Sequence, residues 1–159
     1  MKKVFFALVL AAVMFNSCGD GTLSLASYNQ RTIAIFNAAS EKWATEREIV
    51  YEHKLSKEET AKLLEGLSTS LDDVIEKTSK LKYPEDAKAF HESILNLYQF
   101  HKETLMPLLE KTQEFEPDSK EWYATWREFD KETGKVDKML GEIEKLQKEL
   151  AAKAGVKLR

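Results

Sequence analysis

The sequence feature that decides the fold is residues 122–150, WYATWREFDKETGKVDKMLGEIEKLQKEL. Mostly apolar side chains recur there in alternating steps of four and three residues over four heptads: Trp122, Trp126, Phe129, Thr133, Val136, Leu140, Ile143, Gln147 and Leu150. This spacing is typical of a helix that packs along its neighbours as helices do in coiled coils. The predicted helix starts at Asp118, has the acidic Glu121 in its first turn and stops at Gly155.

The preceding sequence predicts two more helices, over residues 24–52 and from Ser56 onward. The first has an apolar stripe at three- and four-residue steps: Leu25, Tyr28, Thr32, Ile35, Phe36, Ala39, Trp43 and Val50. The second starts with Ser56 and Glu59 at the spacing of a capping box. Its stripe is Thr60, Leu63, Leu64, Leu67, Leu71, Val74, Ile75, Thr78 and Leu81. Gly66 within it costs about 1 kcal/mol relative to alanine, unless a close helix contact uses it.

Tyr83-Pro84 separates the second helix from a third. Pro84 keeps Tyr83 out of helical conformation and suits the first position of a helix. The third helix has the stripe Ala87, Phe90, Ile94, Leu97, His101, Leu105, Leu108 and Leu109. Pro107 lies inside this stripe and removes a backbone hydrogen bond, which predicts a kink. Residues 114–117 end the helix.

Four amphipathic helices with short connections favour antiparallel neighbours. The sequence therefore predicts an all-α domain over residues 24–154, an elongated antiparallel up-down-up-down four-helix bundle, followed by a short basic tail at 155–159. No window alternates apolar and polar residues for long, so a sheet has little support. The alternative is a helical hairpin that pairs with a second copy.

The first 17 residues have the pattern of a bacterial lipoprotein signal peptide. Lys2 and Lys3 precede the uncharged run 4–15, which as a helix spans about 18 Å, short of the roughly 30 Å hydrocarbon core. Ser17 then precedes Cys18, the chain's single cysteine. This resembles a lipobox, and it predicts a diacylglycerol on the Cys18 thiol and a fatty acyl chain such as palmitate on its amino group. The alternative is an unpaired thiol beside an ordinary cleavage site. Residues 18–23 are expected to be a tether.

The charge pattern argues against nucleic acid as a partner. The chain has 24 basic and 27 acidic residues, a net charge of −3, and its lysines and glutamates alternate without forming a basic patch. With one cysteine, no internal disulfide can form. We expect two kinds of partner: the membrane, through the N-terminal lipid, and an unknown protein or apolar ligand.

Sequence motifs supply no catalytic or metal site. None of the three histidines, His53, His91 and His101, has a glutamate three residues before it, as the helical di-iron motif requires. No phosphate-binding loop or nucleophile elbow is present. His101 lies on the apolar stripe and is expected to be a core histidine hydrogen-bonded to a neighbouring helix. The chain is predicted to be no enzyme and to need no cofactor.

The aromatic residues are the remaining candidates for binding. Trp43, Trp122, Tyr123 and Trp126 have the chemistry to line an apolar pocket between helices or to contact a partner. The alternative is that they fill the core of the bundle. Tyr123 lies beside the seam and is the aromatic side chain expected to be exposed.

Several features together mark a family resemblance: the lipobox, Tyr28-Asn29 opening the first helix, Tyr83-Pro84 before the third helix, and the aromatic stretch 90–100. Residues 18–150 resemble uncharacterised bacterial envelope lipoproteins of the leptospiral surface-protein type. The resemblance implies a four-helix fold at a bacterial envelope, and it transfers no activity or site residue.

The sequence thus predicts a lipid-anchored protein of the bacterial cell envelope that acts as a non-enzymatic binding or interaction module. Gly19 after the cysteine favours the outer membrane, by analogy with sorting in enteric bacteria, and leaves open whether the domain faces the periplasm or the exterior. The alternative function is a carrier or sensor of an apolar small molecule, bound between the helices near Trp43, Trp122 and Trp126.

Overall fold

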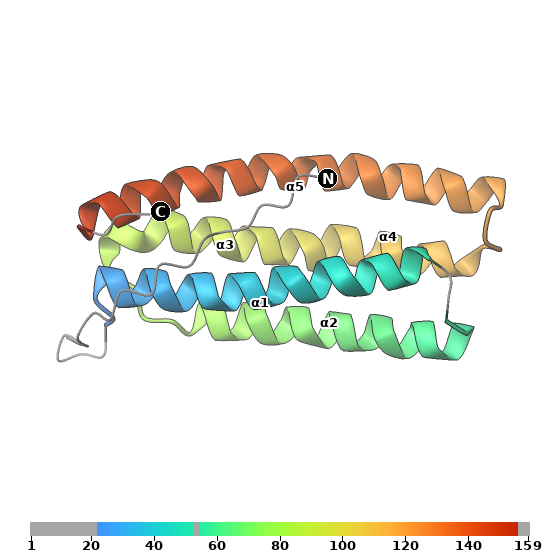
Figure 1. The fold of residues 1–159 in the computed structure, drawn as a ribbon, viewed down its shortest axis with the longest axis horizontal. Helices are drawn as coiled ribbons and strands as arrows, with labels where there is room; N and C mark the ends of the chain where they lie inside the picture. Colours follow the sequence, from blue (N-terminus) through green and yellow to red (C-terminus); the bar gives the residue numbers. More distant parts are fainter. Residues whose placement is uncertain (1–21, 53–54, 156–159) are drawn as a thin grey trace.

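The computed structural model describes residues 22–52 and 55–155 (Figure 1). Within these ranges the chain forms four long helical stretches and no strand, which confirms the predicted all-α class. The four stretches lie alongside one another as a helical bundle, and the longest, α5, covers one side (Figure 1).

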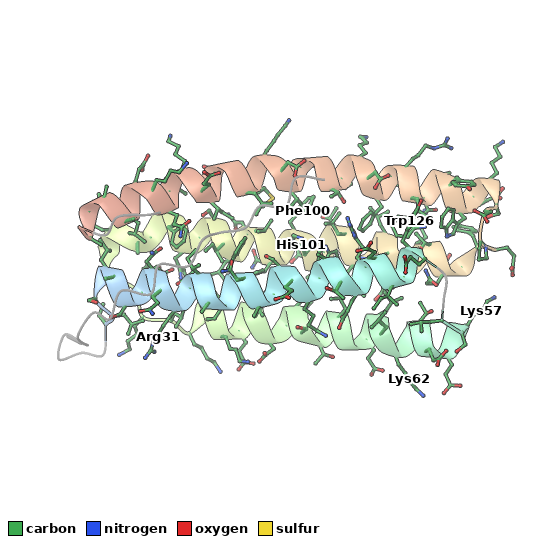
Figure 2. The ribbon with its side chains drawn as sticks, viewed as in Figure 1. Arg31, Lys57, Lys62, Phe100, His101 and Trp126 are labelled. Atoms are coloured by element: carbon green, nitrogen blue, oxygen red, sulfur yellow. The ribbon has the colours of Figure 1, made fainter. Side chains whose placement is uncertain are left out.

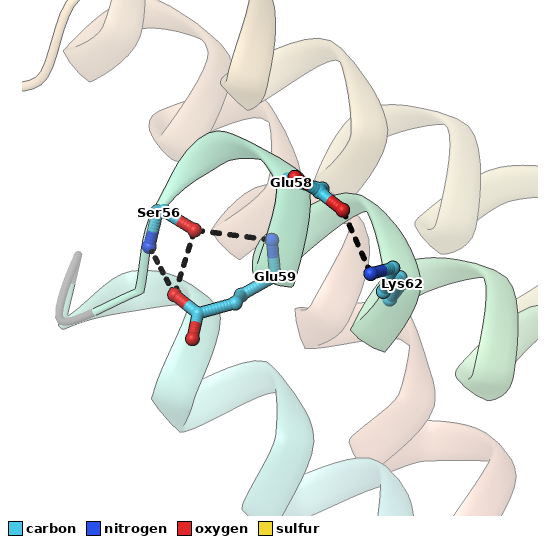
Figure 3. A network of polar contacts seen from close by, with 4 residues as sticks. All are labelled: Ser56, Glu58, Glu59 and Lys62. Carbon is cyan, nitrogen blue, oxygen red and sulfur yellow. Dashed lines mark hydrogen bonds and ion pairs between the residues drawn. The ribbon is translucent and has the colours of Figure 1, made fainter.

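The first two helices begin where the sequence predicts. Helix α1 spans Leu25–Tyr51, and the side chain of Ser24 caps it by accepting a hydrogen bond from the backbone N–H of Ser27 at 3.2 Å. Helix α2 spans Lys57–Ser79. At its start, Ser56 Oγ accepts from the N–H of Glu59 at 3.3 Å, and the Glu59 carboxylate accepts from the N–H of Ser56 at 2.9 Å (Figure 3). The capping box is therefore confirmed.

The third helical stretch is built from short segments: η1 (Glu85–Ala87), α3 (Lys88–Phe100), η2 (His101–Leu105), α4 (Met106–Lys111) and η3 (Thr112–Glu114). Pro84 is extended, with φ −69° and ψ 150°, so it precedes the first helical residue and does not occupy it as predicted. The reason is local: a 3₁₀ turn forms first, in which the N–H of Ala87 donates to the carbonyl of Pro84 at 2.8 Å.

A π-helical turn lies just before Pro107, where the sequence predicts a kink. Segment η2 is this turn, and the N–H of Met106 donates to the carbonyl of His101, five residues back. Pro107 follows in the first turn of α4, where its missing N–H costs least. The wider turn thus accommodates a proline inside a continuous helical stretch.

Helix α5 spans Lys120–Lys153, and its N-cap lies one residue later than predicted. The N-cap is Ser119, whose Oγ accepts from the N–H of Trp122 at 3.1 Å. Asp118 has a left-handed backbone, with φ 63°, and lies before the cap, so the prediction of Asp118 as the cap was wrong. Asparagine and aspartate tolerate this conformation better than other side chains. The predicted stop at Gly155 is confirmed, with φ 67°.

The core forms one contiguous cluster around the seam of α5. Phe129 and Ile143 are fully buried there, while Thr133 and Leu140 are only half-buried. The third stretch faces this seam with further buried side chains: Phe90, Ile94, Leu97, Leu105 and Leu109. The periodicity therefore identified the buried face correctly.

Two contacts define what we call the N-terminal end of the bundle, where α1 begins. The N–H of Leu23 donates to the carbonyl of Lys82 at 3.5 Å, which ties the approach to α1 to the segment after α2. The ammonium of Lys153, at the end of α5, lies 2.7 Å from the carboxylate of Asp86 in η1. This pair is exposed and screened by solvent, so it shows that the end of α5 lies beside η1 but contributes little to stability.

Candidate functional site

Four aromatic side chains from two helices gather at the opposite end of the bundle, which we call the aromatic end. Tyr51 is the last residue of α1, and Trp122, Tyr123 and Trp126 lie in the first two turns of α5. The ring centroid of Tyr51 lies 4.9 Å from that of Trp126 and 5.8 Å from that of Trp122. Figure 2 shows Trp126 toward this end and Arg31 toward the other.

Burial divides the aromatic end into a filled base and an open surface. Trp122 and Trp126 are buried, in ring contact with each other at 5.7 Å, and Phe129 packs against Trp126 at 5.2 Å. Tyr51 is 52 % exposed and Tyr123 is 47 % exposed, and these two are the exposed large hydrophobic side chains of the described residues. The expectation that Tyr123 is exposed is therefore confirmed.

Tyr123 is held in a fixed position by Asp118. The phenol of Tyr123 donates to Asp118 Oδ1 at 2.8 Å. This hydrogen bond, together with the charge of the carboxylate, raises the pKa of Tyr123, because both favour the neutral phenol. Asp118 itself has a left-handed backbone conformation, with φ 63°. The result is an aromatic ring that is open to solvent and already oriented, which lowers the entropy lost when a partner covers it.

Trp43 does not belong to the aromatic end. It is buried and packs edge-on against His101, with ring centroids 4.8 Å apart and planes at 90°. His101 lies midway along the bundle (Figure 2). The structure thus brings together three of the four aromatic residues identified from the sequence and places the fourth in the core.

Tyr51 is the residue of the aromatic end that the sequence analysis missed. It follows Val50, where the predicted stripe of the first helix stops, so its place beside the stripe gave no reason to select it. Its position in the chain could have identified it. In a four-helix bundle whose helices alternate in direction, an aromatic residue at the end of the first helix lies near the start of the last helix.

A separate hollow of about 400 Å³ lies between α2 and α4, lined by Ala61, Leu64, Glu65, Ser68, Thr69 and Glu110. Two carboxylates and two hydroxyls line it, so it suits an apolar ligand poorly. Trp43, Trp122 and Trp126 are not among the lining residues.

His101 lies in the core as expected, but its hydrogen bond differs from the prediction. Its Nδ1 lies 2.8 Å from the carbonyl oxygen of Leu97, one turn earlier in the same helical stretch. Because a carbonyl only accepts, Nδ1 carries the proton in the neutral ring. Burial lowers the pKa of His101, although the Leu97 carbonyl opposes this effect. A partner on a neighbouring helix was therefore the wrong expectation.

A polar group at the N-terminal end of the bundle was also missed. His91 is buried, and its Nδ1 lies 2.9 Å from the hydroxyl of Tyr28, which is fully buried. The ring of Tyr83 stacks on His91 at 4.1 Å. Burial lowers the pKa of His91 and raises that of Tyr28 to about 12. His91 lies next to Phe90, off the narrow stripe read from the sequence, and the partners converge only in the folded chain.

The leader, Cys18 and His53 lie outside the described residues. Among the described residues, no three His, Cys, Asp or Glu side chains group as metal ligands would. In the same part of the chain no helix has the length and apolarity to cross a membrane.

Comparisons with protein-family models, curated proteins and solved structures gave no match. The resemblance to envelope lipoproteins of the leptospiral surface-protein type therefore stays a prediction from the residue pattern.

Proposed function

We propose that this chain is a lipid-anchored protein of the bacterial cell envelope that acts as a non-enzymatic interaction module and binds a partner protein at its aromatic end. The observation that carries this proposal is the pair of half-exposed tyrosines, Tyr51 and Tyr123, seated on two buried tryptophans. Interfaces draw most of their binding energy from a few Tyr, Trp and Arg side chains on a well-packed support.

The proposed topology places the anchor and the binding surface at opposite ends. We infer that successive helices alternate in direction, up-down-up-down. The contact of Tyr51 with Trp122 supports this, because it joins the end of α1 to the start of α5. The pair of Lys153 with Asp86 supports it at the other end. The 27 residues of α1 then separate the start of this helix from the aromatic end by about 40 Å.

The lipid anchor rests on the sequence. A lone cysteine after an uncharged run of signal-peptide length is the pattern of a lipidated N-terminus, and two or more acyl chains give stable membrane attachment. With the anchor before the start of α1, a surface at the other end of this helix is positioned to reach a partner that does not lie on the same bilayer.

The alternative, a carrier of an apolar small molecule, has less support. The rings of Trp122, Trp126 and Phe129 contact one another directly, and Trp43 packs on His101. The tryptophans thus behave as core side chains, and the hollow between α2 and α4 has two carboxylates and two hydroxyls in its lining and no tryptophan.

Site-specific photocrosslinking in the native cell tests the proposal. A photoreactive amino acid at position 123 is expected to give a discrete adduct that disappears when Tyr51 is also changed to Ala. The matched control places the same amino acid at Arg31, an exposed residue on the same bundle, where no such adduct is expected. Identical adducts at both positions, or none at 123, would refute the aromatic end as the binding surface.

The anchor needs a separate test, because the two parts of the proposal can fail independently. Cys18→Ala is expected to move the protein from the membrane fraction to the soluble fraction. Mass spectrometry of the native N-terminal peptide then identifies the acyl groups. A bare thiol, or a leader still attached, contradicts the anchor and leaves the crosslinking result standing.

A further inference from the structure

The group of Tyr28, Tyr83 and His91 at the N-terminal end of the bundle has no part in the proposed function. His91 is 3 % exposed and lies between two tyrosines from different parts of the chain. Tyr28 comes from α1 and bonds to its Nδ1 at 2.9 Å, and Tyr83 comes from the segment between α2 and η1 and stacks on its ring at 4.1 Å, with planes at 27°.

Tyr83 attaches the connecting segment 80–84 to the bundle. This segment has no helical structure, and Tyr83 is half-buried. Its ring contacts both His91 and Tyr28, the latter at a centroid distance of 6.1 Å. The carbonyl of Lys82 in the same segment accepts the hydrogen bond from Leu23, the residue that leads into α1. The position of Tyr83 therefore affects how the N-terminal segment joins the bundle.

The hydrogen bond to Tyr28 depends on the charge of His91. A neutral imidazole can accept the Tyr28 hydroxyl proton at Nδ1, but an imidazolium has donors on both nitrogens. When His91 is protonated, the Tyr28 oxygen must accept a hydrogen bond from Nδ1. The hydroxyl proton of Tyr28 then no longer has the imidazole nitrogen as its acceptor. The protonated ring also brings a full charge into a site from which water is excluded.

Among the described residues, no carboxylate is hydrogen-bonded to His91 that would offset the cost of burying its positive charge. Tyr28 faces it from α1 and Tyr83 from the connecting segment, and both present a phenol, not a carboxylate. Glu92, on the same helix, is exposed and gives a weak favourable interaction. Lys153 of α5 pairs with Asp86, and Lys80 after α2 pairs with Glu76. The ring face of Tyr83 attracts a cation, but burial outweighs these effects and lowers the pKa of His91.

We propose that His91 and Tyr83 form an acid-sensitive latch, in which protonation of His91 releases Tyr83 and segment 80–84 and so loosens the junction between the bundle and its N-terminal segment. Release of Tyr83 is the shortest route by which water reaches the charged ring, because Tyr83 is the half-buried member of the group while Tyr28 is fixed in α1. The rest of the core stays packed. This inference stands whether or not the aromatic end binds a partner.

Hydrogen–deuterium exchange of the full chain at pH 7.5 and pH 5.0, corrected for the intrinsic pH dependence of exchange, tests the latch. The amides of 80–88 and of Leu23 are expected to lose protection several-fold at pH 5.0, and to lose more than the centre of α2, whose protection follows the stability of the whole bundle. The largest loss of protection that protonation of one histidine can cause is about 30-fold between these pH values. This limit applies if the imidazole in the open state is exposed and has the ordinary pKa near 6.5. Equal protection of 80–88 at the two pH values would overturn the proposal.

The variant His91→Gln keeps a polar side chain beside Tyr28 and cannot become charged, so it is expected to remove the acid-induced loss of protection. The matched control is His101→Gln, which removes the half-buried histidine of the same helical stretch and is expected to leave the response of 80–88 intact. A response that persists in His91→Gln, or that disappears in His101→Gln, assigns the effect elsewhere and rejects the latch.

A measurement on the unmodified chain covers the case in which His91→Gln does not fold. Ring resonances of His91 and amide resonances of 80–88 are followed by NMR across the same pH range. Their titration midpoints are expected to coincide. Separate midpoints would show that the segment opens for another reason and would overturn the proposal.

Discussion

Three glycines inside the helices offer a sharp test of the structure. Gly66 in α2 and Gly134 and Gly141 in α5 are exposed, and a Cβ built on any of them meets no atom within 4 Å. Alanine therefore adds no clash and is better than glycine in a helix by about 1 kcal/mol at each position. The close helix contact considered for Gly66 is absent. For separated sites the effects add, so the triple variant is expected to gain about 3 kcal/mol.

Urea unfolding followed by circular dichroism measures this gain. For a chain of this size 1 kcal/mol corresponds to roughly 4 °C, so the melting temperature of the triple variant is expected to rise by roughly 10 °C. Gly155→Ala is the matched control, because the same change at a φ of 67° forces alanine into a left-handed conformation and costs about 1 kcal/mol. A triple variant no more stable than the parent, at an unchanged m-value, or a stabilising Gly155→Ala, would refute the reasoning.

Other predictions concern a cap, the core and the buried histidines. Ser119→Ala is expected to lower the free energy of unfolding by about 1 kcal/mol, because it removes the N-cap of α5. Asp118→Gly is expected to change it little, because glycine suits the left-handed backbone. Urea titrations compare the two variants, and a larger loss for Asp118→Gly would show that Asp118 is the cap. Ile143→Ala is expected to cost about 3 kcal/mol in the same assay, because this side chain is fully buried in the α5 seam; a cost below about 1 kcal/mol contradicts that burial. Burial lowers the pKa of His91 and His101 below 6.5, so the unfolded chain takes up protons first. Stability is then fully present above about pH 6.5 and falls as the pH drops toward 5, as urea titrations at several pH values will show; a flat profile contradicts it.

The fold was largely predictable because the local signals agree with one another. Ser56 with Glu59 fixed the start of α2, and the seam of α5 identified its buried face from spacing alone. The errors fall where local chemistry offered two solutions. Asp118 and Ser119 are both good capping residues, and the choice of Ser119 accompanies the left-handed turn and the contact of Asp118 with Tyr123.

The candidate site was only partly predictable. Trp122, Tyr123 and Trp126 are neighbours on one helix, so their sequence spacing already brought them together. Tyr51 joins them from a position about 70 residues away, and Trp43, which the sequence grouped with them, packs on His101 in the core. Sequence spacing measures distance along one helix and does not tell how one helix is aligned with another. It therefore could not show that Tyr51 belongs to the aromatic end and that Trp43 does not.

The sequence by itself determined the helices, their buried stripes and most of their ends, because helical periodicity and capping depend on residues within one or two turns. Only the tertiary structure decided which side chains from different helices meet: Tyr51 with the tryptophans of α5, and Tyr28 and Tyr83 with His91. These contacts depend on how the helices are aligned along the bundle. That alignment is set by the packing of the whole core, and no local stretch of the chain contains it.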